Sequence, residues 1–210
     1  MLKKIWNFLW KEDSFLSWVA TAVIFFIIIK FILYPAAGWV FGTSLPMVAV
    51  ITPSMEHKMN VNEAGQIFMC GQTFRERSSV DFDTWWSLCG DWYEDNANIS
   101  KEDFKQFRFS NGLNVGDIVF ARGMSPENIA RGEVVIFQTQ RPTPIIHRVI
   151  ESYEENGVYY FKIKGDNNPD FDRSINEERV HQDQIIGVAR TRLPYLGYLR
   201  IGLARLTGGF

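Results

Sequence analysis

A serine that directly follows an apolar segment stands where it could act as a nucleophile. Residues 48–51 are Val-Ala-Val-Ile, and Thr52-Pro53 ends the run before Ser54. We predict a buried strand over 46–53 that presents the Ser54 hydroxyl at its end. Because a serine hydroxyl is a weak nucleophile at neutral pH, it needs a base within hydrogen-bond reach, usually oriented by a third group. The rest of the chain must supply both.

Three histidines are candidates for the base. His57 follows Ser54 by three residues, and we expect it in a solvated turn. His181 lies in a polar run, which indicates the surface. His147 lies in the apolar segment 144–150 (PIIHRVI), which is typical of a strand, and it is our candidate base. The alternative for His147 is a core histidine whose ring is satisfied by a backbone carbonyl.

The candidate acids lie in one loop. Glu155-Asn156-Gly157 is a hairpin signal, so the strand after it returns beside the strand of His147. Asp166, Asp170 and Asp172 follow that return strand. An aspartate in this loop can therefore reach the imidazole. The alternative is that these aspartates form local Asx-turns, which are common in loops.

Composition limits the functional classes. The chain has 210 residues, 46% of them hydrophobic, and a formal net charge of −2, which fits one compact domain and a membrane anchor. We expect no nucleic acid partner, because the charge is nearly balanced and no long run of like charge occurs. We also expect no metal and no cofactor.

The amino-terminal part of the chain indicates the anchor. Residues 15–34 contain one charge, Lys30, and are long enough to span ~30 Å of hydrocarbon as a helix. A cleaved secretory signal would have a shorter apolar core, so we predict a retained anchor over 14–40. The Lys30 stem can reach toward an interface. Pro35 is expected to end or kink the helix.

Charge asymmetry around this span predicts its orientation. Residues 1–13 form a short amphipathic helix with Lys3, Lys4 and Lys11, and no Lys or Arg follows the span until Lys58. Positive residues favour the cytoplasmic side of a membrane. We therefore predict a single-pass protein of the cell membrane or the endoplasmic-reticulum membrane. Its amino terminus would be cytoplasmic and its remaining domain extracytoplasmic.

Residues 60–111 differ in composition from their surroundings and are predicted to be a helical insertion. They contain several tryptophans and both cysteines, Cys70 and Cys89. Ser100 to Asp103 resembles a capping box at the start of a helix. The cysteines either form a disulfide, which suits an extracytoplasmic segment, or are two small buried hydrophobes.

After the insertion the pattern changes to short strands. We predict strands over 115–121, 132–137, 144–152, 158–164 and 184–190. Residues 41–59 and 112–200 would form one domain. Several short strands at close spacing predict a mainly β fold, a curled antiparallel sheet or barrel. The tail over 201–210 is expected to lie along the membrane surface or to cover the sheet.

Several of these segments together resemble the successive signature boxes of type I signal peptidases. The boxes are 52–56 (TPSME), 116–119 (GDIV), 145–149 (IIHRV), 164–168 (KGDNN) with Asp172-Arg173, and 187–190 (GVAR) with 193–197 (LPYLG). They occur in the order of that family, after one amino-terminal span. The resemblance covers about 45–59 and 112–200, and it implies the fold of that family.

The resemblance also implies roles for the residues. Bacterial enzymes of this type carry lysine where this chain has His147, so histidine is similar to the archaeal and endoplasmic-reticulum form. It implies Ser54 as nucleophile, His147 as general base and Asp172 as the acid. Asp166 matches an aspartate that the family also needs, as a supporting acid or for structure. A histidine with an acidic partner titrates near working pH.

Two features depart from the family pattern. Relatives carry a small residue where this chain has Pro53, which lacks a backbone N–H. The oxyanion donors that remain are the Ser54 N–H and the Thr52 hydroxyl, which matches a serine in bacterial relatives. The second departure is the insertion 60–111, to which the resemblance assigns no role. It could be a lid, a partner surface or a recognition element.

These features lead to one expected function. We expect a membrane-anchored serine endopeptidase that removes signal peptides from translocated preproteins, with the lipid bilayer and the translocation machinery as surroundings. The cleavage segment would add as a strand beside 47–51. A related processing protease with fewer clients is one alternative. The other is a catalytically inactive, membrane-tethered β-module that binds partners through its tryptophan-rich insertion.

Overall fold

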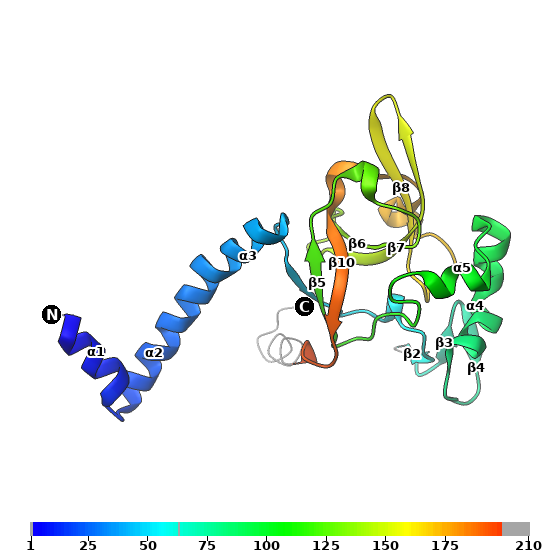
Figure 1. The fold of residues 1–210 in the computed structure, drawn as a ribbon. Helices are drawn as coiled ribbons and strands as arrows, with labels where there is room; N and C mark the ends of the chain where they lie inside the picture. Colours follow the sequence, from blue (N-terminus) through cyan, green and yellow to red (C-terminus); the bar gives the residue numbers. More distant parts are fainter. Residues whose placement is uncertain (1, 63, 199–210) are drawn as a thin grey trace.

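The computed structural model describes residues 2–62 and 64–198. It consists of an amino-terminal helical arm, a curled β-sheet domain and a small helical subdomain on the far side of the sheet from the arm (Figure 1). The predicted tail over 201–210 lies outside the described residues. The predicted fold class, mainly β with one apolar helix and a helical insertion, is confirmed.

The arm begins with the amphipathic helix α1, Leu2–Lys11, which turns back along α2, Phe15–Ile28. The Ser14 side chain caps α2 by accepting a hydrogen bond from the Ser17 N–H, and the Ser17 hydroxyl donates to the Phe8 carbonyl at 2.6 Å. These bonds fix the angle between the two helices.

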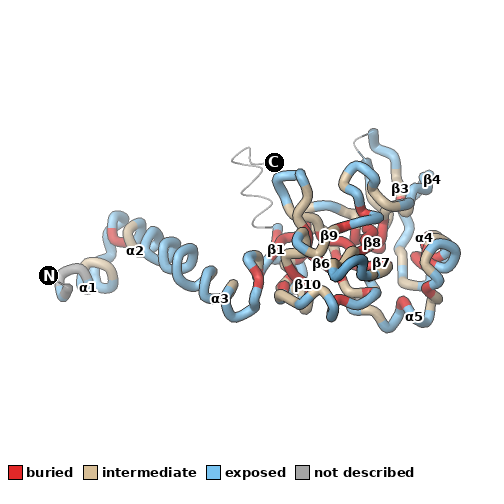
Figure 2. The backbone as a smooth tube through the Cα atoms, turned by 90° about the horizontal axis from the view of Figure 1, so that it is seen from above, coloured by how far each residue is buried: buried red, intermediate tan, exposed pale blue. Residues whose placement is uncertain are grey.

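The apolar helix continues without a break to Phe41. A π-helical turn, Ile29–Leu33, joins α2 to α3, Tyr34–Phe41, so that Phe15–Phe41 forms one 27-residue helix that is long and apolar enough to cross a membrane. We expected Pro35 to end or kink this helix, and it does not end it. Pro35 lacks a backbone N–H, and the wider π-helical turn ends at Leu33, two residues before it. Most of the residues of this helix are exposed (Figure 2).

The main sheet has seven antiparallel strands in the order β1-β5-β10-β6-β7-β8-β9. The strands are β1 Met47–Ala49, β5 Ile118–Arg122, β6 Val134–Phe137, β7 Ile145–Glu155, β8 Val158–Lys164, β9 Val180–His181 and β10 Ile185–Leu193. Register shifts in β7 and β10 mark irregularities of the kind that bend a sheet. Within the described part of the chain, β1 is an edge strand, since it pairs with β5 alone.

The sheet packs on both of its faces. One cluster of buried aliphatic residues lies between β1, β5, β6 and β10, and a second lies between β6, β7, β8 and β10. Figure 2 shows the buried backbone concentrated in these strands. The Asn156-Gly157 turn between β7 and β8 has positive φ at both residues, as the sequence signal predicted.

The insertion between Met59 and Leu113 forms a subdomain of its own. It has a three-stranded sheet of β2 Asn60–Val61, β3 Ile67–Met69 and β4 Gln72–Phe74, followed by α4 Phe82–Ala97 and α5 Lys101–Gln106. The predicted helices and the Ser100 capping box are present, whereas the small sheet was not predicted. Cys70 and Cys89 form a disulfide.

Candidate active site

Ser54 lies in a 3-10 turn, Pro53–Met55, at the end of the extended segment that continues β1. Thr52 is extended (φ −121°, ψ 153°), and Pro53 occupies the first position of the turn, where its fixed φ and missing N–H are tolerated. The Glu56 N–H donates to the Pro53 carbonyl at 3.0 Å and closes the turn. The backbone thus turns at Ser54, and the Ser54 hydroxyl lies beside the sheet.

His147 reaches that hydroxyl from β7. Its side chain is almost fully buried, and its Nε2 lies 2.9 Å from Ser54 Oγ. Gly165 permits the approach, because a Cβ at this position would lie 2.9 Å from both His147 Nε2 and the Ser54 carbonyl oxygen. The structure therefore brings the predicted nucleophile and base into hydrogen-bond contact.

The second nitrogen of His147 contacts Glu177, a residue that we did not predict. Glu177 Oε1 lies against His147 Nδ1, and its side chain is fully buried. Asn176, with a φ of 57°, directs the chain into the 3-10 turn Glu177–Arg179. The other carboxylate oxygen of Glu177 accepts the backbone N–H of Asp172. Ser54, His147 and Glu177 form a continuous hydrogen-bonded series.

The predicted acid Asp172 occupies another position. Its carboxylate accepts hydrogen bonds from the Ser174 hydroxyl at 2.6 Å, the Ser174 N–H at 2.9 Å and Arg141 Nη2 at 2.9 Å, and these bonds lower its pKa. The described structure contains no hydrogen bond between the Asp172 side chain and His147. The predicted contact is not formed, because the Asp172 carboxylate caps the turn Arg173–Ile175 and only its N–H faces Glu177.

Asp166 lies at the centre of a separate buried network. Arg148 donates to both of its oxygens, from Nε at 2.8 Å and Nη2 at 2.6 Å. Tyr93 OH lies 3.1 Å from Oδ1, and His57 Nε2 lies 3.0 Å from Oδ2. Burial alone would raise the pKa of Asp166, but the Arg148 charge and these hydrogen bonds hold it well below its usual value. Asp166 is therefore a fully bonded anion beside the site.

Two other predictions about single residues can be compared with the structure. His57 is buried, so its assignment to a solvated turn is wrong; its ring stacks on Trp85 with centroids 3.7 Å apart. Asp170 is exposed and accepts the indole N–H of Trp92 at 3.1 Å. The sequence carried no signal for the first of these contacts, since Trp85 lies in the insertion.

The two candidate oxyanion donors lie beside the nucleophile. Thr52 Oγ1 is 3.2 Å from Ser54 Oγ. The Ser54 N–H is in the first turn of a helix, where backbone donors have no partner within the helix, and the described structure gives it no other protein acceptor. The Ser54 N–H is thus without an acceptor among the described residues, and the Thr52 hydroxyl lies within hydrogen-bond distance of Ser54 Oγ.

A cavity of about 260 Å³ opens in front of these groups. Its walls come from the residues that continue β1, 49–52, and from the start of β7, 143–147. Most of these wall residues are apolar, while Arg141 and Asp172 stand at the polar part of its lining. Among the described residues, no cluster of three His, Cys, Asp or Glu side chains is placed to hold a metal ion.

Comparison with curated proteins shows where the similarity lies. The chain is 38% identical over 91 residues to the signal peptidase complex catalytic subunit SEC11C of Homo sapiens. The matched segment is 41% of this chain and 47% of that protein. It is 32% identical over 90 residues to the catalytic subunit sec11 of Schizosaccharomyces pombe, covering 40% of this chain and 48% of that protein. No protein-family model matches.

A third relative gives the same picture. The signal peptidase complex catalytic subunit SEC11 of Yarrowia lipolytica is 37% identical over 78 residues, 35% of this chain and 45% of that protein. The matched part of the chain thus spans about half the length of the curated relatives. The resemblance to signal peptidase catalytic subunits that the sequence indicated is confirmed over this part.

Proposed function

We propose that this chain, similar over part of its length to signal peptidase catalytic subunits, is a membrane-anchored serine endopeptidase that cleaves signal peptides from preproteins. The observation that carries the proposal is the contact between His147 Nε2 and Ser54 Oγ at 2.9 Å, in the lining of a cavity. A nucleophile with a base in hydrogen-bond reach is the minimal machinery of acyl transfer.

The reaction proceeds in two steps. Ser54 Oγ attacks the carbonyl carbon of the scissile bond while its proton passes to His147 Nε2, and His147 then gives that proton to the leaving amine. Water, deprotonated by the same nitrogen, releases the acyl group from Ser54. The Ser54 N–H and the Thr52 hydroxyl stabilise the oxyanion in both steps.

We assign the orienting acid to Glu177 rather than to Asp172. A carboxylate against Nδ1 fixes the tautomer in which Nε2 accepts the serine proton, and it stabilises the imidazolium that forms. Glu177 has this contact, and its second oxygen is held by the Asp172 N–H. The Asp166 carboxylate already accepts four hydrogen bonds, two from Arg148, one from His57 and one from Tyr93. We therefore assign Asp166 to support of the fold around the site.

The cavity supports an extended peptide as substrate. Because β1 is an edge strand, its backbone groups on one side are open to pairing with an added strand. Such a strand would run between 49–52 and the start of β7, past Ser54. The mostly apolar walls would contact the side chains next to the scissile bond.

The anchor and the disulfide support the proposed topology. The helix Phe15–Phe41 is long enough to span a bilayer, three lysines precede it, and no Lys or Arg follows it until Lys58. The Cys70–Cys89 disulfide suits an oxidising compartment on the other side. Enzyme and signal peptide would then share one membrane plane, which raises their effective concentration.

The tryptophan-rich insertion does not favour the alternative of an inactive binding module. Trp85 and Trp86 are buried in the subdomain core, and Trp92 packs edge-on against Phe171. These rings therefore hold the subdomain together instead of forming an exposed apolar surface.

The test is cleavage of a preprotein by membranes that contain the full chain. We expect Ser54→Ala and His147→Ala to abolish cleavage. Ser125→Ala, which removes an exposed serine hydroxyl outside the cavity, should leave cleavage unchanged. Full cleavage by Ser54→Ala would exclude the proposed function.

A further inference from the structure

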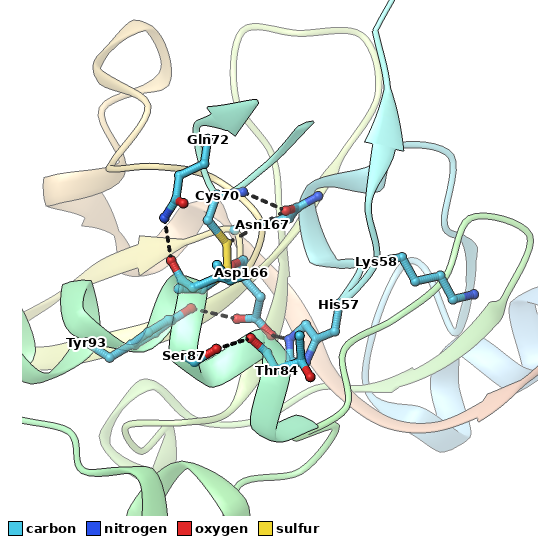
Figure 3. The surroundings of a disulfide bond; sticks show 12 residues. His57, Lys58, Cys70, Gln72, Thr84, Ser87, Tyr93, Asp166 and Asn167 are labelled. Carbon is cyan, nitrogen blue, oxygen red and sulfur yellow. Dashed lines mark hydrogen bonds and ion pairs between the residues drawn. A yellow bond between two sulfur atoms is a disulfide. The ribbon is translucent and has the colours of Figure 1, made fainter. Parts of the chain in front are cut away.

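Asn167 connects the insertion to the backbone of the nucleophile. Its N–H donates to the Ser54 carbonyl at 2.8 Å, and its Nδ2 donates to the Pro53 carbonyl at 3.2 Å. Its Oδ1 accepts the Cys70 N–H at 3.0 Å (Figure 3). Asn167 is only 3% exposed, so water does not compete strongly for these bonds.

The Cys70 N–H is available because of the turn in which it lies. Met69 and Gln72 pair across a two-residue hairpin turn made of Cys70 and Gly71, with φ values of 49° and 79°. Both are the positive values of a type I′ turn. In such a turn the N–H of the first central residue lies outside the ladder. The hairpin therefore offers a fixed donor to Asn167.

One disulfide and one hydrogen bond join this hairpin to α4. The disulfide joins Cys70 in the turn to Cys89 in the helix. Gln72 Nε2 donates to the Leu88 carbonyl at 2.9 Å beside it (Figure 3). The position of the Cys70 N–H is thus set in part by the helix, and removal of the disulfide would leave the Gln72 bond and the packing of Met69 to hold it.

The same face of α4 also contacts the residues around the site. Tyr93 OH bonds Asp166, the neighbour of Asn167, and Trp85 stacks on His57, which follows the nucleophile turn. Both aromatic side chains are fully buried. The insertion therefore contacts two segments next to Ser54: the loop of Asn167, which bonds the Ser54 carbonyl, and His57, three residues after Ser54.

We propose that Asn167 is a positioning residue for Ser54, and that the disulfide-bonded insertion fixes Asn167. The peptide geometry of Pro53 and Ser54 sets both the direction of the Ser54 hydroxyl and the direction of its N–H. Errors of about 1 Å in such groups can cost ~10²-fold in rate. Asn167 does not line the cavity, so it acts on the reaction and not on substrate binding. The catalytic part of this proposal rests on the proposed function.

The experiment compares Asn167→Ala with the wild-type chain in detergent or membranes by two measurements. The first is amide hydrogen exchange of residues 52–56, which needs no substrate. The second is kcat and KM for preprotein cleavage. Asn96→Ala, which removes an exposed asparagine of α4, is the matched control.

We expect Asn167→Ala to speed exchange at 52–56 by at least about tenfold and to lower kcat by about tenfold or more, with KM within about twofold. The chain with Cys70→Ala and Cys89→Ala should shift both quantities in the same direction by about threefold. This double variant keeps the Asn167 side chain, so its exchange rates and kcat test the proposal if Asn167→Ala does not fold.

Unchanged exchange at 52–56 in both variants would overturn the proposal. A loss that appears in KM and not in kcat would overturn it as well, because that result places Asn167 in substrate binding. A wild-type chain that cleaves no preprotein would reject the proposed function alone, since the exchange measurement then still decides whether the insertion positions Ser54.

Discussion

His147 Nδ1 is bonded to Glu177, whereas Asp172 reaches that carboxylate only through its backbone N–H. The acid beside the base therefore comes from the turn Glu177–Arg179, five residues after the aspartate that the resemblance indicates. Asp172 holds Glu177 in place, and its own side chain pairs with Arg141 at the cavity.

This arrangement predicts unequal effects of two amide substitutions. Glu177→Gln should lower kcat by about 10³–10⁴-fold, because the neutral amide can favour the wrong tautomer and does not stabilise the imidazolium. Asp172→Asn should cost no more than about threefold, since asparagine also caps a turn and the Arg141 pair is partly exposed. Steady-state cleavage of a preprotein measures both. A larger loss for Asp172→Asn would return the orienting role to Asp172.

Thr52 is predicted to contribute to oxyanion stabilisation. Thr52→Ala should lower kcat by about 10²–10³-fold with a small change in KM, because its hydroxyl acts on charge that develops in the transition state. Thr52→Ser keeps the hydroxyl and should stay within a few-fold of the wild type. Equal rates for the alanine and serine variants would show that the hydroxyl does not contribute.

Asp166 is predicted to be the most important carboxylate for stability. Asp166→Asn leaves Arg148 buried without its anion and should lower the free energy of unfolding by ~3–5 kcal/mol. Because the folded pKa of Asp166 lies below its usual value, its stabilisation is complete above about pH 5 and is lost as the pH falls below about 4.

The difference in unfolding free energy between the wild type and Asp166→Asn should therefore shrink on acidification. Denaturant unfolding at about pH 7 and about pH 3 measures this difference. Asp91→Asn, at an exposed position of α4, is the matched control and should show a difference near zero at both pH values. A difference that does not depend on pH would contradict the prediction.

The burial of Lys164 leads us to predict that folding stability depends on pH in the alkaline range. Its ammonium is buried over the rings of Trp92 and Tyr93, at 4.6 Å and 5.0 Å from their centroids, and donates to the Gly165 carbonyl. Burial lowers its pKa from 10.5 to about 8. Between these two values the unfolded chain keeps a proton that the folded chain has released, so the stability of the wild type rises with pH in this window.

The comparison variant is Lys164→Met, which keeps the length of the side chain. The stability of the wild type relative to this variant should increase by about 2–3 kcal/mol from about pH 7.5 to about pH 10. Thermal unfolding at these two pH values measures the change. A relative stability that falls over this range would reverse the sign and contradict the assignment.

The strands were predictable because their signals are local: Val, Ile and Phe runs between turn residues mark them. The apolar run that ends in Thr-Pro-Ser indicated a candidate nucleophile, but its pairing with His147 was implied by the family resemblance. The Asn156-Gly157 turn sets which strand lies beside β7. Local patterns thus indicate the strands and their order around β7, whereas the contact between His147 and Ser54 needed the resemblance.

Glu177 was not predictable from such patterns. It lies in the polar run NEER, which is typical of an exposed segment, and its burial depends on a positive φ at Asn176 and on the N–H of Asp172. His57 was misplaced for a similar reason: its partner Trp85 is 28 residues away along the chain, in a segment with no predicted contact to the site. Pairings between distant segments leave no periodic signal.

The end of the apolar helix is fastened to the β domain. The Gly123 N–H donates to the Phe41 carbonyl at 2.8 Å, and the Thr43 hydroxyl donates to the Ile186 carbonyl at 2.8 Å. Only five residues, Gly42 to Pro46, separate α3 from β1, a reach of at most ~18 Å. Under the proposed function, bilayer thickness and helix tilt would therefore set the height of Ser54 above the membrane surface, and with it the bond of an emerging chain that can be cut.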